Sequence, residues 1–489
     1  MQPVVTPSEM AAADRRAIEE GTSFETLVDR AGTAVAWHVR HVVGGVYGRR
    51  AVVVCGKGNN GADGLVAAER LRAWGMGVDV LRLEDDPPKD ALAEVCDRAD
   101  VVVDAMYGTG FRGSLDGFAE EVANATTRAS ATVVAVDIPS GVDGTTGECS
   151  GEVVRADHTL TFAARKTGLV LQPGRAHAGA VTVADIGIRV DPSPVGITDG
   201  VDVLRWLSPR EPDTHKWAVG GVMVVGGATG MTGAPQMVSH AAMRAGAGIV
   251  WCAVPGHEAA AAASGSEVIT VAVAAADDGT LAADAAARVL DDAGRFGALV
   301  VGPGLGGGSG VEQAVRRLVS EARVPLVLDA DGLNALHGDL TLLRERGASL
   351  GASTLLTPHD GEFARLMGEP PGSDRIAAAR RLADAAQSTV LLKGSTTIVA
   401  EPGSGGRVAL NTTGGPWLAT AGSGDVLSGI AGAFTARGCE MFEAGAAGAW
   451  VHGRAADAAG HTGLIAGDLI DALPEVLRDP LGRVRDQEA

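Results

Sequence analysis

Short apolar runs that end in loops rich in glycine, aspartate and asparagine recur along this chain of 489 residues. The runs Arg50–Cys55, Val101–Ala105 and Thr132–Val136 are typical of strands buried on both faces, and segments of helical periodicity separate them. Parallel strands need long crossover connections, so this alternation predicts a largely parallel sheet covered by helices. The chain is therefore expected to belong to the α/β class.

The remaining elements are predicted from periodicity and turn signals. Helices are expected over 8–43, with Ser8 as N-cap, and over 62–74, 90–98, 118–127, 425–437, 444–459 and 466–477. Further strands are expected over 78–83, near Val153, and over 158–162, 180–184, 221–225, 248–253, 298–302, 325–329, 354–357 and 389–393.

A proline-rich stretch interrupts the pattern between about 192 and 217, where Pro192, Pro194, Pro209 and Pro212 lie among polar residues. Such a stretch is typical of a domain junction. We therefore expect two domains, residues 1–212 and residues 213–489.

Charge and composition exclude several partners. The formal net charge is −19, and no basic tail or face stands out, so neither nucleic acid nor an anionic membrane is expected as a partner. No apolar run reaches ~18–20 residues, and the first residues lack the apolar core of a signal peptide. The five cysteines are scattered and odd in number, which indicates reduced thiols and a cytoplasmic protein.

Three loops in the first half carry polar side chains directly after strands. The first, Gly56 to Gly61, matches G-x-G-x-x-G, the second contains Asp104, and the third contains Asp137 and Ser140. The first loop is typical of a turn that binds a dinucleotide. The structural alternative is a tight turn in which an asparagine adopts the left-handed conformation and Asp63 caps the following helix. Because ligands of open α/β sheets bind at the carboxyl ends of strands, Asn60, Asp104, Asp137 and Ser140 are expected to converge.

The donor atoms of these loops indicate the kind of cation that they suit. Asn, Asp and Ser offer hard oxygen ligands, which favour an alkali or alkaline-earth ion over zinc. The sequence contains no cluster of His and Cys with the spacing of a transition-metal site.

The segments GKGNNGADG, DAMYGTGFRG, DIPSGVDG and FAARKTGL resemble the NAD(P)H-hydrate epimerase family. The resemblance implies a Rossmann-like three-layer αβα domain that binds hydrated nicotinamide nucleotide and K⁺. It assigns the potassium ligands to Asn60, Asp104 and Ser140. It assigns the nucleotide contacts to Asn59, Asn60, Gly61, Ala62, Asp63, Gly108, Thr109, Gly110, Phe111, Arg112, Gly113, Ser114 and Asp137. Ala62 departs conservatively from the family's usual glycine, and Asp137 is the expected acid–base residue.

The second half contains a longer motif, from Asn411 to Leu427, with Gly-Ser-Gly-Asp at residues 422–425. Backbone N–H groups of this turn would face an anion at the start of the following helix, and Asp425 stands where a base is needed. A flexible glycine turn with Asp425 as a helix cap is the structural alternative.

The motif, together with GGATGMTGAP, GPGLG, DADGLN, TPHDGE and LKGSTT, resembles the ADP- or ATP-dependent NAD(P)H-hydrate dehydratases, a ribokinase-like family. The resemblance implies a ribokinase-like α/β domain that uses ADP with Mg²⁺. It assigns the contacts with the hydrated nucleotide to Ala234, Gly304, His359 and Asp425. It assigns the contacts with the adenine nucleotide to Lys393, Gly394, Ser395, Thr396, Thr397 and Gly424. Trp217 replaces the glycine of the family's His-Lys-Gly.

These motifs predict a bifunctional enzyme that epimerises hydrated NAD(P)H and dehydrates the S form with ADP, giving AMP and phosphate. By resemblance a homo-oligomer is expected. A vitamin-precursor kinase with an accessory domain, a non-enzymatic binding protein and an NAD-dependent dehydrogenase remain alternatives. Only five basic residues are lysines, and Lys57, Lys166, Lys216 and Lys393 all lie in these motifs, which favours functional roles for them.

Overall fold

The computed structural model describes residues 1–85, 92, 95–96, 98–128, 130–257, 260–261 and 267–481. They form two compact units, one of residues 3–193 (the N-terminal unit) and one of residues 1–2 and 194–489 (the C-terminal unit). Residues 194–206 belong to the C-terminal unit because β9 (Val195–Ile197) pairs with β18 (Val408–Asn411) and α7 (Gly200–Trp206) packs on α18 (Met441–Ala459). The functional boundary at 212 stays a prediction.

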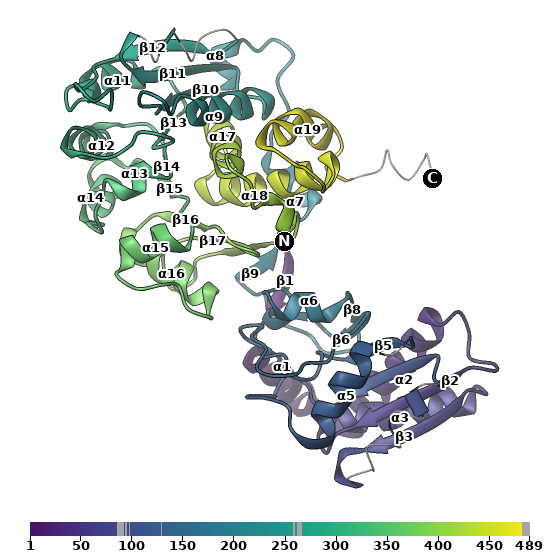
Figure 1. Ribbon diagram of the computed structural model, residues 1–489. Helices are drawn as coiled ribbons and strands as arrows, with labels where there is room; N and C mark the ends of the chain where they lie inside the picture. The colour runs from purple at the N-terminus through teal and green to yellow at the C-terminus, as the bar shows by residue number, and fades with distance from the viewer. Residues whose placement is uncertain are drawn as a thin grey trace. The chain divides into compact units, whose positions relative to one another are not determined.

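The N-terminal unit is built on a parallel sheet with the strand order β3-β2-β4-β5-β6-β8 (Figure 1). Its strands are β2 (Arg50–Cys55), β3 (Gly77–Arg82), β4 (Val101–Ala105), β5 (Thr132–Val136), β6 (His158–Phe162) and β8 (Ala180–Ala184). Outside this six-stranded sheet, β1 (Gln2–Val5) pairs in parallel with β7 (Arg165–Lys166).

Alternate residues of the central strands enter two separate apolar clusters. Val53 and Val103 pack with α1 (Pro7–Glu19), α2 (Phe24–Val42) and α3 (Asn59–Ala73), whereas Val52 and Val102 pack with α5 (Gly117–Arg128). The short helix α6 (Gly174–Ala178) precedes β8. Helices therefore cover both faces of the sheet, and the expected three-layer αβα arrangement is confirmed.

Several predicted boundaries in this unit were wrong. The helical stretch 8–43 is two helices, capped by Thr6 and Ser23 rather than Ser8, because residues 20–23 turn the chain between them. Helix α3 begins at Asn59, so its asparagines are helical and Asp63 lies inside the helix instead of capping it. The segment near Val153 is not a strand. The predicted helix 90–98 lies largely outside the described residues.

The C-terminal unit contains a sheet of mixed direction, in the order β12-β11-β10-β13-β14-β15-β16-β17-β18-β9. All pairs are parallel except β16–β17 and β17–β18. The strands not yet located are β10 (Gly221–Val225), β11 (Ile249–Pro255), β12 (Ile269–Val273), β13 (Ala298–Val301), β14 (Leu326–Leu328), β15 (Thr354–Leu356), β16 (Thr389–Leu392) and β17 (Thr397–Ala400).

Two groups of helices accompany this sheet, as Figure 1 shows. One group packs around the buried helix α17 and consists of α9 (Gly233–Arg244), α17 (Ser423–Ala436), α18 and α19 (Ala466–Arg478). A second group consists of α11 (Ala285–Ala293), α12 (Ser309–Glu321), α14 (Thr341–Leu350) and α16 (Arg375–Ala386). The short helices are α8 (Lys216–Val219), α13 (Asp331–Asn334) and α15 (Asp360–Met367).

The apolar runs of this half were predicted to within two residues, but the strands β9, β12, β17 and β18 were missed. Helix α17 begins at Ser423 rather than 425, because Gly422 adopts a left-handed conformation and ends the preceding loop. Asp425 thus lies in the first turn of the helix.

Candidate active sites

A cavity of about 730 Å³ opens in the N-terminal unit at the carboxyl ends of its strands. The loops after β2 and β4 supply part of its wall, and α1 and α2 supply another part. Its lining residues include Met10, Asp14, Phe24, Leu27, Lys57, Asn59, Asn60, Asp63, Met106, Tyr107, Gly108, Thr109, Gly110, Phe111, Asp137, Phe162, Lys166 and Ile188. The cavity thus combines apolar walls with a few convergent polar groups, as small-molecule sites do.

Asp137 stands at the carboxyl end of β5 and faces this cavity. Its backbone φ is +66°, in the left-handed region that residues other than glycine rarely adopt. Such backbone strain is frequent at functional sites. Its Oδ1 accepts hydrogen bonds from Lys166 Nζ at 2.6 Å and Thr161 Oγ1 at 2.9 Å. Lys166 is 1% exposed and also donates to the Phe162 carbonyl. The fold therefore fixes a carboxylate beside a buried ammonium group.

Two further carboxyl groups share the cavity with Asp137. Burial, together with the charges of Asp137 and Asp14, raises the pKa of Asp63 to about 8. Burial also raises the pKa of Asp14, and the Asp137 charge adds to this effect, although Lys166 opposes it. The cavity thus holds one ion-paired carboxylate and two carboxyl groups with elevated pKa values.

The predicted potassium ligands lie in buried positions next to the cavity. Asp104 is fully buried, and its carboxylate accepts hydrogen bonds from Ser140 Oγ at 2.7 Å and from the Ser140 amide at 2.8 Å. Burial, partly offset by these bonds, raises the pKa of Asp104 to about 6. A side chain at Gly108 would lie 3.5 Å from the Asn60 side chain, whose buried amide nitrogen lacks a hydrogen-bond partner. The loops therefore meet, as predicted.

The predicted nucleotide contacts divide into two groups. Asn59, Asn60, Asp63 and residues 108–111 line the cavity. Arg112 instead forms an ion pair with Asp143 at 3.3 Å, and Ser114 pairs with Ser150 as a bridge. Sequence reasoning missed Asp14 and did not include Lys166 among the site residues. Asp14 lies in a helix that carries no recognisable motif, whereas the lysine scarcity was a usable signal for Lys166.

In the C-terminal unit, Asp425 lies in the first turn of α17. Burial and the neighbouring Asp329 charge raise the pKa of Asp425 to about 6, although Lys393 opposes this. The Lys393 ammonium is near the same turn, since a side chain at Gly424 would lie 3.6 Å from its Nζ. The predicted base and the predicted phosphate-binding lysine are therefore neighbours at one helix N-terminus.

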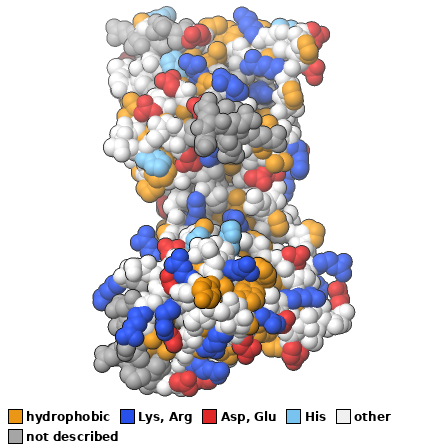
Figure 2. Space-filling view, turned by 90° about the vertical axis from the view of Figure 1, so that its right-hand side faces the viewer, with side chains coloured by type: hydrophobic (Ala, Val, Ile, Leu, Met, Phe, Trp, Pro, Cys, Tyr) orange, Lys and Arg blue, Asp and Glu red, His pale blue; other side chains and the backbone are white. Residues whose placement is uncertain are grey.

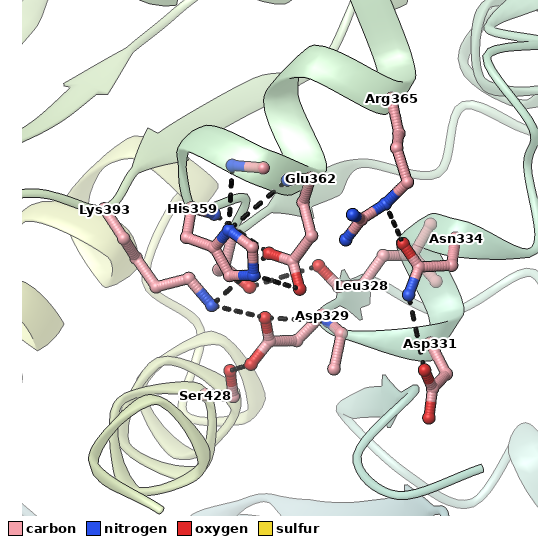
Figure 3. A network of polar contacts seen from close by, with 12 residues as sticks. Leu328, Asp329, Asp331, Asn334, His359, Glu362, Arg365, Lys393 and Ser428 are labelled. Carbon is pink, nitrogen blue, oxygen red and sulfur yellow. Dashed lines mark hydrogen bonds and ion pairs between the residues drawn. The ribbon is translucent and has the colours of Figure 1, made fainter. Parts of the chain in front are cut away.

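Lys393 is the centre of a buried ion-pair network (Figure 3). Its Nζ donates to Asp329 Oδ1 at 2.7 Å and lies 3.8 Å from Glu362 Oε2. Burial lowers the pKa of Lys393, but the charges of Asp329 and Glu362 outweigh it and raise the pKa above its usual value. Asp329 also accepts from Ser428 Oγ at 2.6 Å, which connects the end of β14 to α17. Lys393 is therefore held by two carboxylates and is not a solvated lysine at the end of a strand.

His359 caps helix α15, since its Nδ1 accepts from the amides of Gly361 at 3.0 Å and Glu362 at 3.3 Å. Its ring is still 54% exposed, with Nε2 at 3.3 Å from Glu362 Oε1. Figure 3 shows a second chain of contacts nearby, in which Arg365 donates to Asn334 and Asn334 donates to Asp331. Both ring nitrogens of His359 therefore have contacts within α15, and the ring still remains more than half exposed.

Of the remaining predicted residues, Ala234 lies in the first turn of α9, and the others lie in loops or at strand ends of this sheet. A side chain at Gly304 would lie 3.4 Å from Ala234 Cβ, so these two positions are adjacent. Residues 394–396 form the turn between β16 and β17, and Thr397 begins β17. Arg375 closes this turn by donating to the Lys393 carbonyl at 2.8 Å.

On the face shown in Figure 2, acidic and basic side chains are interspersed over the surface. Within the described residues no helix is both long and apolar enough to cross a membrane. The same residues contain no group of three His, Cys, Asp or Glu side chains placed to hold a metal ion.

Comparison with known proteins identifies both halves. A family model described as NAD(P)H-hydrate dehydratase matches residues 222–477, and one described as YjeF-related protein N-terminus matches 24–97 and 86–168. Bifunctional NAD(P)H-hydrate repair enzymes of Moorella thermoacetica and Salinibacter ruber are each 38% identical to this chain. The alignments cover 97% of both chains for the first, and 99% of this chain and 98% of the relative for the second.

A solved structure of the ADP/ATP-dependent NAD(P)H-hydrate dehydratase from Bacillus subtilis, co-crystallised with ATP and Mg²⁺, is 26% identical, with a TM-score of 0.49. It covers 58% of this chain and 99% of its own. The near full-length relatives and the two family models, taken together, show that this chain belongs to the bifunctional NAD(P)H-hydrate repair enzyme family.

Proposed function

We propose that the N-terminal unit interconverts the R and S epimers of hydrated NAD(P)H and that the C-terminal unit dehydrates the S epimer with ADP, releasing AMP and phosphate. The observation that carries this proposal is the presence of two separate acid–base sites. One is Asp137 paired with Lys166 in the cavity, and the other is Asp425 beside Lys393 at the start of α17.

In the first site, Asp137 accepts the proton of the hydroxyl group on C6 of the hydrated ring. As the C6–O bond becomes a carbonyl, the C6–N1 bond breaks and N1 gains a proton. Rotation about C5–C6 and closure on the other face then yield the opposite epimer. Lys166 supports this role because its buried ammonium donates a 2.6 Å hydrogen bond to Asp137 and holds its side chain in place.

Asn60, Asp104 and Ser140 would hold the potassium ion of this site. Their carboxylate, amide and hydroxyl oxygens suit a hard cation, and all three residues are buried. A bound K⁺ would stabilise negative charge that develops on the nucleotide.

In the second site, Asp425 takes the proton of the C6 hydroxyl, whose oxygen attacks the terminal phosphorus of ADP. AMP leaves, the new C6–O phosphate is then expelled as the C5 proton departs, and the dihydronicotinamide forms. The amides at the start of α17 and the Lys393 ammonium, which lies near the same turn, would hold the phosphates and stabilise their charge. Mg²⁺ bound with the nucleotide would neutralise part of its charge.

The residues that match the motifs of the two families are proposed to contact the substrates. In the first unit they are residues 59–63, 108–114 and Asp137, of which Asn59, Asn60, Asp63, residues 108–111 and Asp137 line the cavity. In the second they are Ala234, Gly304, His359 and Asp425 for the hydrated nucleotide, and Lys393 to Thr397 with Gly424 for the adenine nucleotide. A homo-oligomer is also proposed, which light scattering of the purified protein would test.

One assay tests both activities. Mixed epimers of hydrated NADH are offered with and without ADP, and the recovery of NADH absorbance at 340 nm is followed. Full recovery with ADP is expected for the wild type, recovery of only the S fraction for Asp137→Asn, and none for Asp425→Asn. NADH recovery without a nucleotide would contradict the ADP-dependent step, and phosphorylation of an unrelated alcohol with higher efficiency would favour the kinase alternative.

A further inference from the structure

The epimerisation chemistry, on which this inference rests, needs two groups and not one. A base must accept the hydroxyl proton, and an acid must supply a proton to N1 as the C6–N1 bond breaks, with the roles reversed on ring closure. Asp137, which accepts a hydrogen bond from the Lys166 ammonium, is suited to the first task. The second group must carry a proton and reach the same cavity.

Two carboxyl groups of the cavity meet that description in part. Asp63 is only 7% exposed and lies one turn from Asn60 in α3, so a potassium ion held there would favour its ionised form. Asp14 extends from α1, a helix distant in sequence from the three potassium ligands, and it lines the cavity with a partly exposed side chain.

We infer that Asp14 is the second acid–base residue of the epimerase site: it donates the proton that N1 gains during ring opening and takes it back on closure.

The charges around Asp14 agree with this role. The groups that act on it are Asp137 at the end of β5, Lys166 in β7 and the exposed Arg15 on its own helix. Burial is the largest influence and raises the pKa of Asp14, which keeps a proton available to higher pH than in an exposed aspartate. Asp63, facing the cavity from α3, senses the charge of Asp14 in turn.

Asp14→Asn in the full chain tests the inference, because the amide keeps the shape and removes the proton donor. Mixed epimers with ADP are expected to yield the S fraction at the wild-type rate and then stop. Conversion of the R epimer should be slowed by about 10²–10⁴-fold. Glu19→Gln, on the exposed side of the same helix, is the matched control and should convert both epimers.

The outcomes separate the inference from the proposed function. If the wild type itself leaves the R epimer, the epimerase proposal fails. If Asp14→Asn converts both epimers at the wild-type rate, the role of Asp14 is refuted. A purely structural role would lower thermal stability, and Asp14→Glu would not restore turnover.

If Asp14→Asn does not fold, Asp14→Glu carries the test. Its carboxyl is displaced by one methylene, so a lower kcat with an unchanged KM is expected. In the wild type, kcat for epimerisation should fall on the alkaline side as Asp14 loses its proton, and Asp14→Glu should move that limb. An unchanged kcat and an unmoved alkaline limb would overturn the inference.

Discussion

Each proposed site pairs a lysine with an aspartate, and the lysine is buried in the first site and partly buried in the second. Lys166 holds Asp137 at 2.6 Å in the first unit, and Lys393 holds Asp329 at 2.7 Å in the second. A guanidinium group is larger and planar, so it does not fit where a compact ammonium satisfies its partners. This explains physically why lysine is retained at these positions in a chain that otherwise uses arginine.

Lys393→Arg is therefore expected to slow ADP-dependent dehydration by at least about tenfold, or about 1.4 kcal/mol of transition-state stabilisation. The guanidinium would disturb both the Asp329 contact and the space beside Gly424. Steady-state kinetics at varied ADP measure the effect. Lys89→Arg, at the one lysine outside the motifs, is the control and should behave as wild type; equal kinetics for both variants would contradict the role of Lys393.

The pH dependence of dehydration follows from Asp425. A general base works as the carboxylate, which is present above its pKa, and this pKa is raised by burial and by Asp329 to about 6. The value of kcat/KM should therefore fall as the pH drops through about 6.

Asp329→Asn tests this assignment, because loss of the like charge should lower the pKa of Asp425 and move the acidic limb of the profile to lower pH. Ser428→Ala is the matched control, since it removes a hydrogen bond to Asp329 and keeps its charge. A limb that stays in place in Asp329→Asn would show that another group is the base.

At the scale of elements, the strands buried on both faces were predictable because short, continuous apolar runs bounded by turn residues are typical of such strands. Short strands such as β14 and β17 depend on their neighbours and were placed inexactly or missed. The contact of Asp104 with Ser140 and the approach of Asn60 to the loop after β4 were predictable, since strand-end loops meet at one edge of a sheet. Asp14 was not, because only tertiary packing brings α1 to the cavity.

The start of α17 depends on Gly422, whose φ is +87°. A side chain there would meet the sulfur of Met237 at 2.5 Å and would add a strain of about 1–2 kcal/mol from the left-handed backbone. Gly422→Ala is expected to displace the turn and to reduce dehydration strongly, while epimerisation persists.

Gly438→Ala is the matched control, because Gly438 also has a positive φ of +93° but open space around it. Its substitution should cost similar stability in urea denaturation and leave dehydration intact. If both variants dehydrate equally well, the geometry of the 422–425 turn is not critical.

At the scale of the whole molecule, each unit has its own sheet and its own apolar core. The N-terminal cavity is lined by residues of the N-terminal unit alone. Each proposed activity therefore needs groups from one unit only, and the epimer released by one site can reach the other through solvent.

An equimolar mixture of Asp137→Asn and Asp425→Asn is thus expected to recover all NADH from mixed epimers, although the first variant alone recovers only the S fraction and the second none. Absorbance at 340 nm measures the recovery. A mixture that stops at the S fraction would mean that the product must pass directly within one chain.

The cavity wall also offers a handle for chemical labelling. Lys57 is exposed and lines the cavity, whereas Lys166 is shielded by its partners and Lys393 is largely covered. An amine-reactive dye used sparingly should therefore attach at Lys57 long before it reaches the two paired lysines. In Lys216→Arg, which removes the other exposed lysine of the described residues, such a label would sit on the wall of the proposed epimerase cavity and report on its occupancy while the proposed dehydration site stays unlabelled.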